Sequence, residues 1–284
     1  MRIEHEPDET NPEKVTIDSR MRAVLARAYI NMPWAHLPRH IGLVLEYGMN
    51  VEIGFGAREL ECAPVSEIAK SVGMLRDRGC RITVHGPFWD LCPGSIDSAV
   101  REVARSRLGQ LFETLEHVRP DQIVCHTGFD PRHHRGHRAA WIENSIAAWE
   151  FFAGQAERIG APLLLENVWE EDPALHLELF RAVGSPWLGF CLDTGHQNAF
   201  SRTSLASWLE STAPYLKEVH LHDNDGSFDH HLPMGRGNID FDYLFRFLGA
   251  HGLRPLVTLE PHKVEHLYES LQALSRMESF FGFL

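Results

Sequence analysis

The sequence predicts a single (β/α)₈ barrel, and three observations lead to that prediction. Eight short runs rich in β-branched and apolar residues recur along the chain, as buried parallel strands do. Longer amphipathic segments separate these runs, and the alternation indicates a parallel α/β fold. Eight such units within 284 residues fit one closed TIM barrel, which needs about 250 residues.

The eight expected strands follow one another from residue 27 onward. In an open, doubly wound sheet the first strand would lead into a glycine-rich G-x-G-x-x-G turn, and no such turn follows it here. The closed barrel is therefore favoured over the open sheet. The strands are expected at 27–34, 49–55, 81–87, 122–128, 162–168, 188–195, 218–224 and 255–261.

Three of the segments between strands carry clear helix signals. Residues 98–118 show apolar side chains at helical spacing. Residues 204–217 begin with Ser204 as an N-cap and contain a proline in their last turn. Residues 241–252 end at Gly252, a residue that favours the C-terminal end of a helix.

The chain is expected to hold one domain, with a tail before it. Residues 1–20 are acidic and interrupted by proline, which predicts a poorly ordered tail, and residues 21–284 form the barrel. The start has no apolar core of a secretory signal, and no apolar run approaches the roughly 18 residues that span a bilayer. The five cysteines include no C-x-x-C pair. We expect a cytoplasmic protein without a membrane partner.

The 18 histidines are out of proportion to the rest of the composition, and many directly follow apolar runs. Six successive expected strands end in a histidine or a carboxylate. Their separations of 41, 40, 27, 27 and 40 residues are close to the length of one βα unit, about 30 residues. The carboxyl ends of barrel strands meet at one rim, so all six should face the same mouth. They are His85, His126, Glu166, Asp193, His220 and Glu260.

These six residues predict a site for divalent metal ions. A buried carboxylate without a partner costs several kcal/mol, so cations are expected among the carboxylates. Histidine mixed with Asp and Glu suits Zn²⁺, with Mn²⁺ and Fe²⁺ as alternatives. His196 follows a strand-end carboxylate by three residues, and Asp229 and His231 flank a turn in the loop after the seventh strand.

A family resemblance rests on motifs in this order: HGPFWDLCPGS, CHTG, LENV, CLDTGH, VHLHDNDG, DHHLPMGRGNI and TLEPH. They resemble the endonuclease IV branch of the xylose-isomerase-like TIM barrels, over roughly residues 80–262. The resemblance implies two or three metal ions. The first would bind His85, His126 and Glu166; the second Glu166, Asp193, His220 and Glu260; the third His196, Asp229 and His231.

A complete ligand set of this kind implies a metal-dependent phosphodiesterase. Closely spaced metal ions activate a water, which we expect Glu260 to orient while Glu166 bridges two ions. HGPFWDLCPGSID and HLHDNDGSFDHHL are similar to the cobamide-remodelling phosphodiesterases, so the expected substrate is a small phosphoester, with a corrinoid as one candidate. An abasic-site DNA endonuclease stays as a less favoured alternative, because the net charge of −12 and the acidic segment GARELECAPVSE disfavour DNA binding.

Two other classes stay open. Sugar isomerases and epimerases of the same superfamily use one metal on the equivalents of Glu166, Asp193, His220 and Glu260, with the two glutamates as acid and base. A noncatalytic metal- or corrinoid-binding protein would keep the ligands without turnover. The sequence leaves open the substrate, the native metal and the oligomeric state.

The expected substrate-binding residues surround this site. Trp89 and Trp169 follow ligand-bearing strands, and His222 lies beside a ligand position. Arg132 belongs to the segment 130–138, whose arginines and histidines would either grip an anionic substrate or form a solvated loop. Glu52 points either into the site or outward at a helix, and the sequence does not decide between them.

Overall fold

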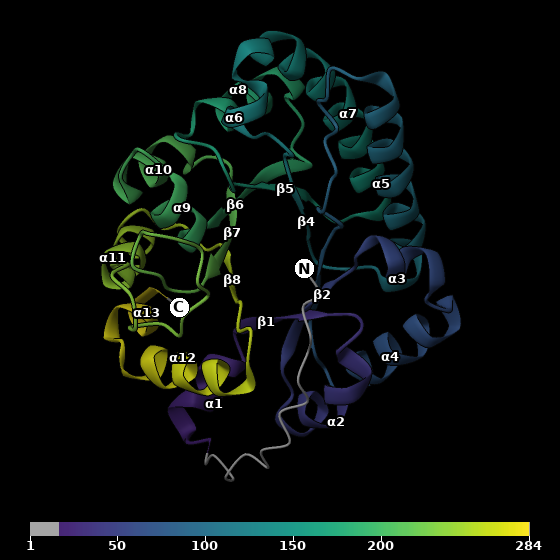
Figure 1. Ribbon diagram of the computed structural model, residues 1–284. Helices are drawn as coiled ribbons and strands as arrows, with labels where there is room; N and C mark the ends of the chain where they lie inside the picture. The colour runs from purple at the N-terminus through teal and green to yellow at the C-terminus, as the bar shows by residue number, and fades with distance from the viewer. Residues whose placement is uncertain (1–16, 284) are drawn as a thin grey trace.

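The computed structural model describes residues 17–283, and its centre is a closed barrel of eight parallel strands (Figure 1). β1 pairs with β2 on one side and with β8 on the other, which closes the ring. The predicted (β/α)₈ fold is confirmed. The strands are β1 Ala28–Pro33, β2 Asn50–Gly54, β3 Ile82–His85, β4 Ile123–His126, β5 Leu163–Glu166, β6 Leu188–Asp193, β7 Leu216–Leu221 and β8 Leu256–Leu259.

Helices surround the strands on the outside of the ring (Figure 1). No helix among residues 17–283 is long and apolar enough to cross a membrane. The helices are α1 Ser19–Leu25, α2 Leu37–Tyr47, α3 Ala57–Cys62, α4 Val65–Asp77, α5 Ser98–Val118, α6 Pro131–His134, the 3₁₀ turn η1 Arg135–His137, α7 Arg138–Ile159, α8 Ala174–Val183, α9 Thr194–Phe200, α10 Leu205–Thr212, α11 Phe241–Ala250, α12 Val264–Arg276 and α13 Glu278–Phe283.

Two of the three predicted helices agree with the structure, and the third ends earlier than predicted. α5 covers the predicted residues 98–118, and α11 ends two residues before Gly252, whose φ of 65° is typical of a left-handed turn. Ser204 caps α10 by accepting a hydrogen bond from the backbone N–H of Ser207. The expected continuation to residue 217 is wrong, because the helix stops at Thr212 and β7 begins at Leu216. The proline between them cannot supply a helical N–H.

Most of the predicted N-terminal tail lies outside the described residues. The described part begins with Ile17, which is buried, and Asp18, whose carboxylate caps α1 at the N–H of Met21. Ile17, Asp18 and the first residues of α1 thus belong to the segment that the sequence assigns to the tail.

The main apolar core fills the space between the strands and the outer helices, with Trp141, Trp149 and Trp208 fully buried in it. The inside of the barrel is different, because it combines a small apolar cluster of Val124, Leu164 and Cys191 with buried polar side chains. Glu52 and Glu218 project into it and are both 0% exposed. This interior leads directly to the strand ends, where the candidate site lies.

Candidate metal centre

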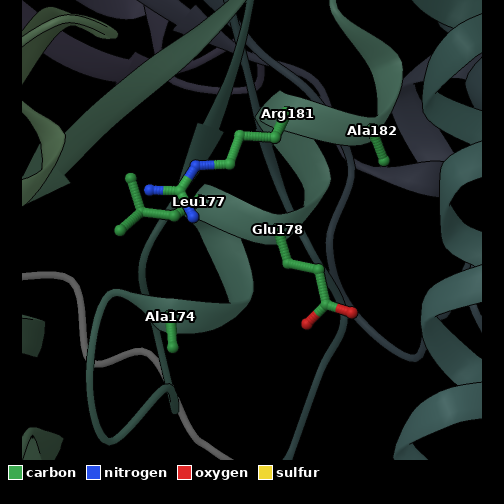
Figure 2. Close-up of a pocket in the computed structure, with 5 residues that line it drawn as sticks. All are labelled: Ala174, Leu177, Glu178, Arg181 and Ala182. Atoms are coloured by element: carbon green, nitrogen blue, oxygen red, sulfur yellow. The ribbon is translucent and has the colours of Figure 1, made fainter.

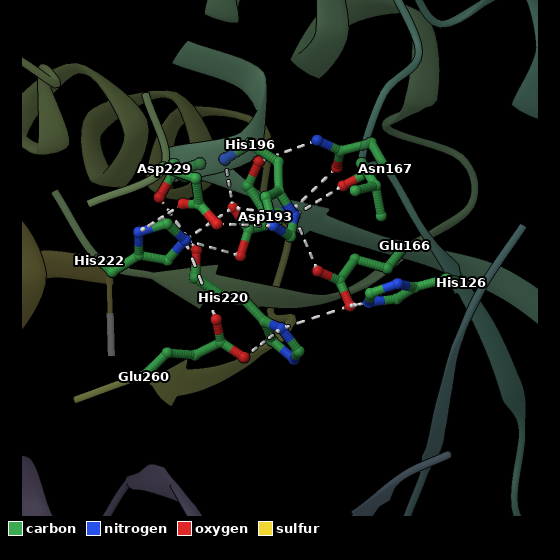
Figure 3. A network of polar contacts seen from close by, with 12 residues as sticks. His126, Glu166, Asn167, Asp193, His196, His220, His222, Asp229 and Glu260 are labelled. Atoms are coloured by element: carbon green, nitrogen blue, oxygen red, sulfur yellow. Dashed lines mark hydrogen bonds and ion pairs between the residues drawn. The ribbon is translucent and has the colours of Figure 1, made fainter. Parts of the chain in front are cut away.

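The six strand-end residues gather at the carboxyl ends of β3 to β8. Figure 3 shows five of them, His126, Glu166, Asp193, His220 and Glu260, converging from neighbouring strands. Four of the six are the last residues of their strands, His220 lies within β7, and Glu260 directly follows β8. The barrel geometry therefore brings together the side chains that the sequence pattern singled out.

Glu166 is the hub of this group. Its Oε2 lies 3.0 Å from His85 Nε2 and 3.3 Å from His126 Nε2, and its Oε1 lies 3.0 Å from His196 Nδ1. Burial alone would raise the pKa of Glu166, but the imidazoles of His126 and His220 overcome it and hold the pKa well below its usual range. Burial likewise opposes protonation of His85, yet its contact with Glu166 raises the pKa of His85 to about 9.

His220 stands between two carboxylates that come from nearly opposite strands of the ring. Its Nδ1 lies 3.1 Å from Glu260 Oε1 and 3.8 Å from Glu166 Oε2. His220 is 0% exposed, and burial lowers the pKa of His220 less than the surrounding acidic groups raise it. Glu260 behaves in the opposite sense: burial raises its pKa, and His220 and His231 bring it well below its usual range. Burial lowers the pKa of His126, in contrast to His85 and His220, so the imidazoles around Glu166 are not equivalent.

A second group lies beside the first, on α9 and the loop after β7. Asp229 Oδ2 is 3.3 Å from His196 Nε2 and 3.2 Å from His231 Nε2. Its Oδ1 is 3.5 Å from His222 Nδ1. Despite partial burial, these imidazoles hold the pKa of Asp229 far below its usual value, and Asp229 in turn helps raise the pKa of His231 to about 9.

Asp223 fixes the loop that carries Asp229 and His231. Its buried carboxylate accepts hydrogen bonds from the backbone N–H groups of Gly235 and Gly237, both at 2.9 Å, and of Ile239 at 3.2 Å. Asp223 also pairs with Leu232 in an antiparallel bridge. The loop is therefore held to the end of β7 on both sides of its turn.

The side chains of the centre fit divalent metal ions. The atoms His220 Nδ1, His222 Nδ1 and Asp229 Oδ1 are buried and have no hydrogen-bond partner among the described residues. Unpaired donors and acceptors of this kind are costly unless something binds them. Ligand atoms within 4.8 Å of one another form the groups His196–His222–Asp229–His231, His85–His126–Glu166, Glu166–Asp193–His220, Asp193–His222–Glu260 and Glu52–Glu218–His220. All nine ligand positions named from the sequence occur in these groups.

Three further residues lie among or beside these ligand atoms. His222 was expected to contact substrate, but it lies among the ligand atoms, with Nε2 3.1 Å from Asp193 Oδ1. Glu218, His220 and His222 lie at every second position along β7 and just after it, so they share the inward face. This spacing of two residues is visible in the sequence and could have indicated that Glu218 and His222 point inward beside His220. Glu52 points inward, with Oε2 3.3 Å from His220 Nε2.

The expected substrate-binding side chains form an outer layer. Trp89 is 79% exposed and packs against Phe88, whose ring stacks on His126 at a centroid distance of 4.6 Å. Trp169 packs against Phe200 at 4.3 Å. These aromatic rings extend outward from the ligand-bearing strand ends.

Each of the three arginines of segment 130–138 pairs with a carboxylate of the protein itself. Arg132 donates to both carboxylate oxygens of Asp130 and lies over the ring of Trp169, 4.4 Å from its centroid. Arg135 bonds Glu171, and Arg138 lies 2.7 Å from Glu178. These pairings favour the solvated-loop interpretation over an open anion grip.

Two hollows on the outside of the barrel are separate from the metal centre. Figure 2 shows one on α8, lined by Ala174, Leu177, Glu178, Arg181 and Ala182. The other lies along α9, α10 and the start of α11 and includes Gln197, Asn198 and Tyr243. Neither contains one of the expected ligands, so the chemistry is assigned to the strand ends.

A family model and one curated protein match most of this chain, and a second curated protein matches less than half of it. A family model described as xylose isomerase-like TIM barrel matches residues 50–277. The uncharacterized protein MJ1311 of Methanocaldococcus jannaschii is 26% identical, over 92% of each chain. A ketose 3-epimerase of Arthrobacter globiformis is 31% identical over 128 residues, which are 43% of this chain and 42% of that protein.

Solved structures show the same fold. The TTHB071 protein of Thermus thermophilus, whose crystal was soaked with ZnCl₂, is 27% identical and superposes with a TM-score of 0.72, covering 87% of this chain and 97% of its own. A D-tagatose 3-epimerase-like protein is 24% identical, with a TM-score of 0.76 and coverage of 88% and 97%.

Proposed function

Because the chain belongs to the xylose isomerase-like TIM barrel family, we propose that it is a metal-dependent sugar epimerase or isomerase that acts on a ketose. One observation carries the proposal. Two carboxylates largely shielded from solvent, Glu166 on β5 and Glu260 after β8, approach the same His220 Nδ1 at 3.8 and 3.1 Å from nearly opposite strands of the ring.

Opposed carboxylates suit the inversion or relocation of a C–H bond next to a ketone. One glutamate takes the proton from the carbon, and a proton returns to that carbon from the opposite face, on the side of the second glutamate. A divalent ion held by Glu166, Asp193, His220 and Glu260 would polarise the ketone and stabilise the charge that develops during proton removal. The side chains of Glu166 and Glu260 are only 1% and 11% exposed, so both carboxylates face the strand-end site rather than bulk solvent.

The similarity to a named ketose 3-epimerase supports the reaction class, and zinc soaking of a related protein agrees with metal binding at this fold. The test is a panel of free ketohexoses and ketopentoses with protein loaded in turn with Mn²⁺, Co²⁺ and Zn²⁺. We expect epimer formation that falls at least 100-fold in both Glu166→Gln and Glu260→Gln, since removing a general acid or base typically costs about 10² to 10⁴ in rate. Glu178→Gln, on the outer face of α8, is the matched control.

A second candidate is a phosphoester hydrolase, and a specific observation favours it. A one-metal isomerase has no use for the His196–His222–Asp229–His231 group, nor for His85 and His126 beside Glu166. Several divalent ions there would suit a metal-activated water and an anionic phosphodiester, including the corrinoid candidate from the motifs.

Metal content per chain separates the two candidates. One equivalent that survives replacement of Asp229 and His231 by Asn supports the epimerase. Two to three equivalents, reduced by those replacements and accompanied by phosphodiester hydrolysis, would transfer the assignment to the hydrolase.

A further inference from the structure

The inner side of His220 faces the polar interior of the barrel, away from the metal centre. Its Nε2 lies 3.3 Å from Glu52 Oε2 and 3.8 Å from Glu218 Oε1, and all three residues are 0% exposed. The ring therefore meets carboxylates on both sides, at ion-pair distance and without an aligned hydrogen bond at either nitrogen.

Glu52 is the better anchored of the two inner carboxylates for contact with His220. Asn31 donates to Glu52 Oε1 at 2.8 Å, and Thr83 lies 3.5 Å from Oε2, so the second oxygen is turned toward the imidazole. Glu218 is instead committed by its Oε1 to the hydroxyl of Thr258, at 2.6 Å. Both carboxylates lack a Lys or Arg partner among the described residues.

A proton on His220 Nε2 explains why Glu52 and Glu218 face this nitrogen better than a second metal ion does. If Nδ1 serves the metal centre, a cation at Nε2 would require the ring to lose both of its protons, and neutral imidazole is the form in which His binds metals. A ligating His normally donates its other N–H to a carboxylate, which fixes the tautomer and the orientation of the ring. Glu52 Oε2 is the nearer of the two carboxylate oxygens that could accept from Nε2, at 3.3 Å against 3.8 Å for Glu218 Oε1.

We propose that Glu52 is a positioning residue: it holds a proton on Nε2 of His220 and so aims the Nδ1 lone pair at the metal. This inference rests on the metal centre of the proposed function, but not on the identity of the substrate. It also accounts for a carboxylate buried on a strand whose outward residues, Val51 and Ile53, pack in the core.

The test is the affinity for Co²⁺ alone, measured by competition with a chromophoric chelator, together with the visible spectrum of the Co²⁺-loaded protein. In Glu52→Gln, the amide keeps its oxygen for the Asn31 donor, so its NH₂ faces Nε2–H and two donors oppose each other. We expect a loss of affinity of about 10- to 100-fold, the usual effect of removing such a partner. Glu218→Gln retains an acceptor for Thr258 and should change the affinity by less than about threefold.

Unchanged folding is checked by thermal unfolding of both metal-free variants, and Glu52→Asp serves as a second variant if Glu52→Gln does not fold. Partial recovery of Co²⁺ affinity in Glu52→Asp, relative to Glu52→Ala, supports a carboxylate acceptor. Equal affinity in wild type and Glu52→Gln would overturn the inference, as would a loss of one metal equivalent in both Glu52→Gln and Glu218→Gln. Tight, Glu52-dependent Co²⁺ binding without activity on any ketose would reject the proposed substrate class and leave the positioning role intact.

Discussion

The ring of His222 lies against the backbone of Gly195, where a Cβ atom would overlap the Cε1, Nδ1 and Nε2 atoms of the imidazole. Gly195 lies between Asp193 and His196, two of the expected ligands, in the first turn of α9. Because Gly195 has no side chain, the ring of His222 can contact both Asp193, at the end of β6, and Asp229, in the loop after β7.

Gly195→Ala should displace His222 and weaken metal binding. The overlap involves three ring atoms of a buried side chain, so the ring has to move. We expect Co²⁺ affinity to fall at least tenfold in titrations with the purified variant. Gly109→Ala is the matched control, because an added Cβ there meets nothing within 4 Å in the middle of α5. That control should keep wild-type affinity and gain roughly 0.5–1 kcal/mol of stability. Equal affinities in both variants would show that His222 does not contribute to the centre.

Metal affinity should rise with pH between about 6.5 and 9. His85 and His231 have pKa values raised to about 9 in the metal-free protein, and each ring must lose a proton before it binds a metal. Below pH 9, each displaced proton adds up to about tenfold in affinity per pH unit. Co²⁺ titrations at constant ionic strength measure the slope. A plateau above pH 7.5 would mean that these rings titrate near the ordinary value or do not bind metal.

Trp89→Ala should affect substrate binding without affecting folding. The side chain is 79% exposed, and surface substitutions of this kind usually change stability by about 0.5 kcal/mol or less. Because Trp89 packs on Phe88, which stacks on His126, we expect a higher KM with kcat nearly unchanged once a substrate is found. Wild-type KM for that substrate would place Trp89 outside the binding surface.

Asp223→Ala should destabilise the protein and loosen the loop after β7. It removes the acceptor of four backbone N–H groups, those of Asn224, Gly235, Gly237 and Ile239, from a residue that is 1% exposed. A hydrogen bond to a charged group contributes about 1.5–3 kcal/mol, so we expect a loss of at least 2 kcal/mol in urea unfolding. Faster amide hydrogen exchange should be confined to residues 223–239. A uniform increase in exchange across the barrel would contradict a local clamp.

The sequence predicts the barrel and most of the metal centre because a few consecutive residues suffice to identify the end of a strand. A β-branched run followed by His85 or Glu166 is such a signal, and parallel strands place these ends on one rim. The face of Glu52 is not readable in the same way, because both faces of a barrel strand are buried and polarity alone does not identify the inner one.

Partners distant in the sequence explain the remaining differences. The guanidinium of Arg132 is held by Asp130 and the distant Trp169, and no local pattern reveals the second contact. The helix after Ser204 ends at Thr212, earlier than the sequence predicts, because the amphipathic spacing continues past the point where β7 begins at Leu216.

The most direct test of the proposed function is exchange of a carbon-bound hydrogen with solvent. Free ketohexoses are incubated with the Mn²⁺-loaded protein in D₂O and followed by ¹H NMR. The account predicts incorporation of one deuterium next to the ketone, with formation of the epimer or isomer, and loss of both signals in Glu166→Gln and Glu260→Gln. Absence of exchange in every ketose, with hydrolysis of a phosphodiester by the same preparation, would contradict it.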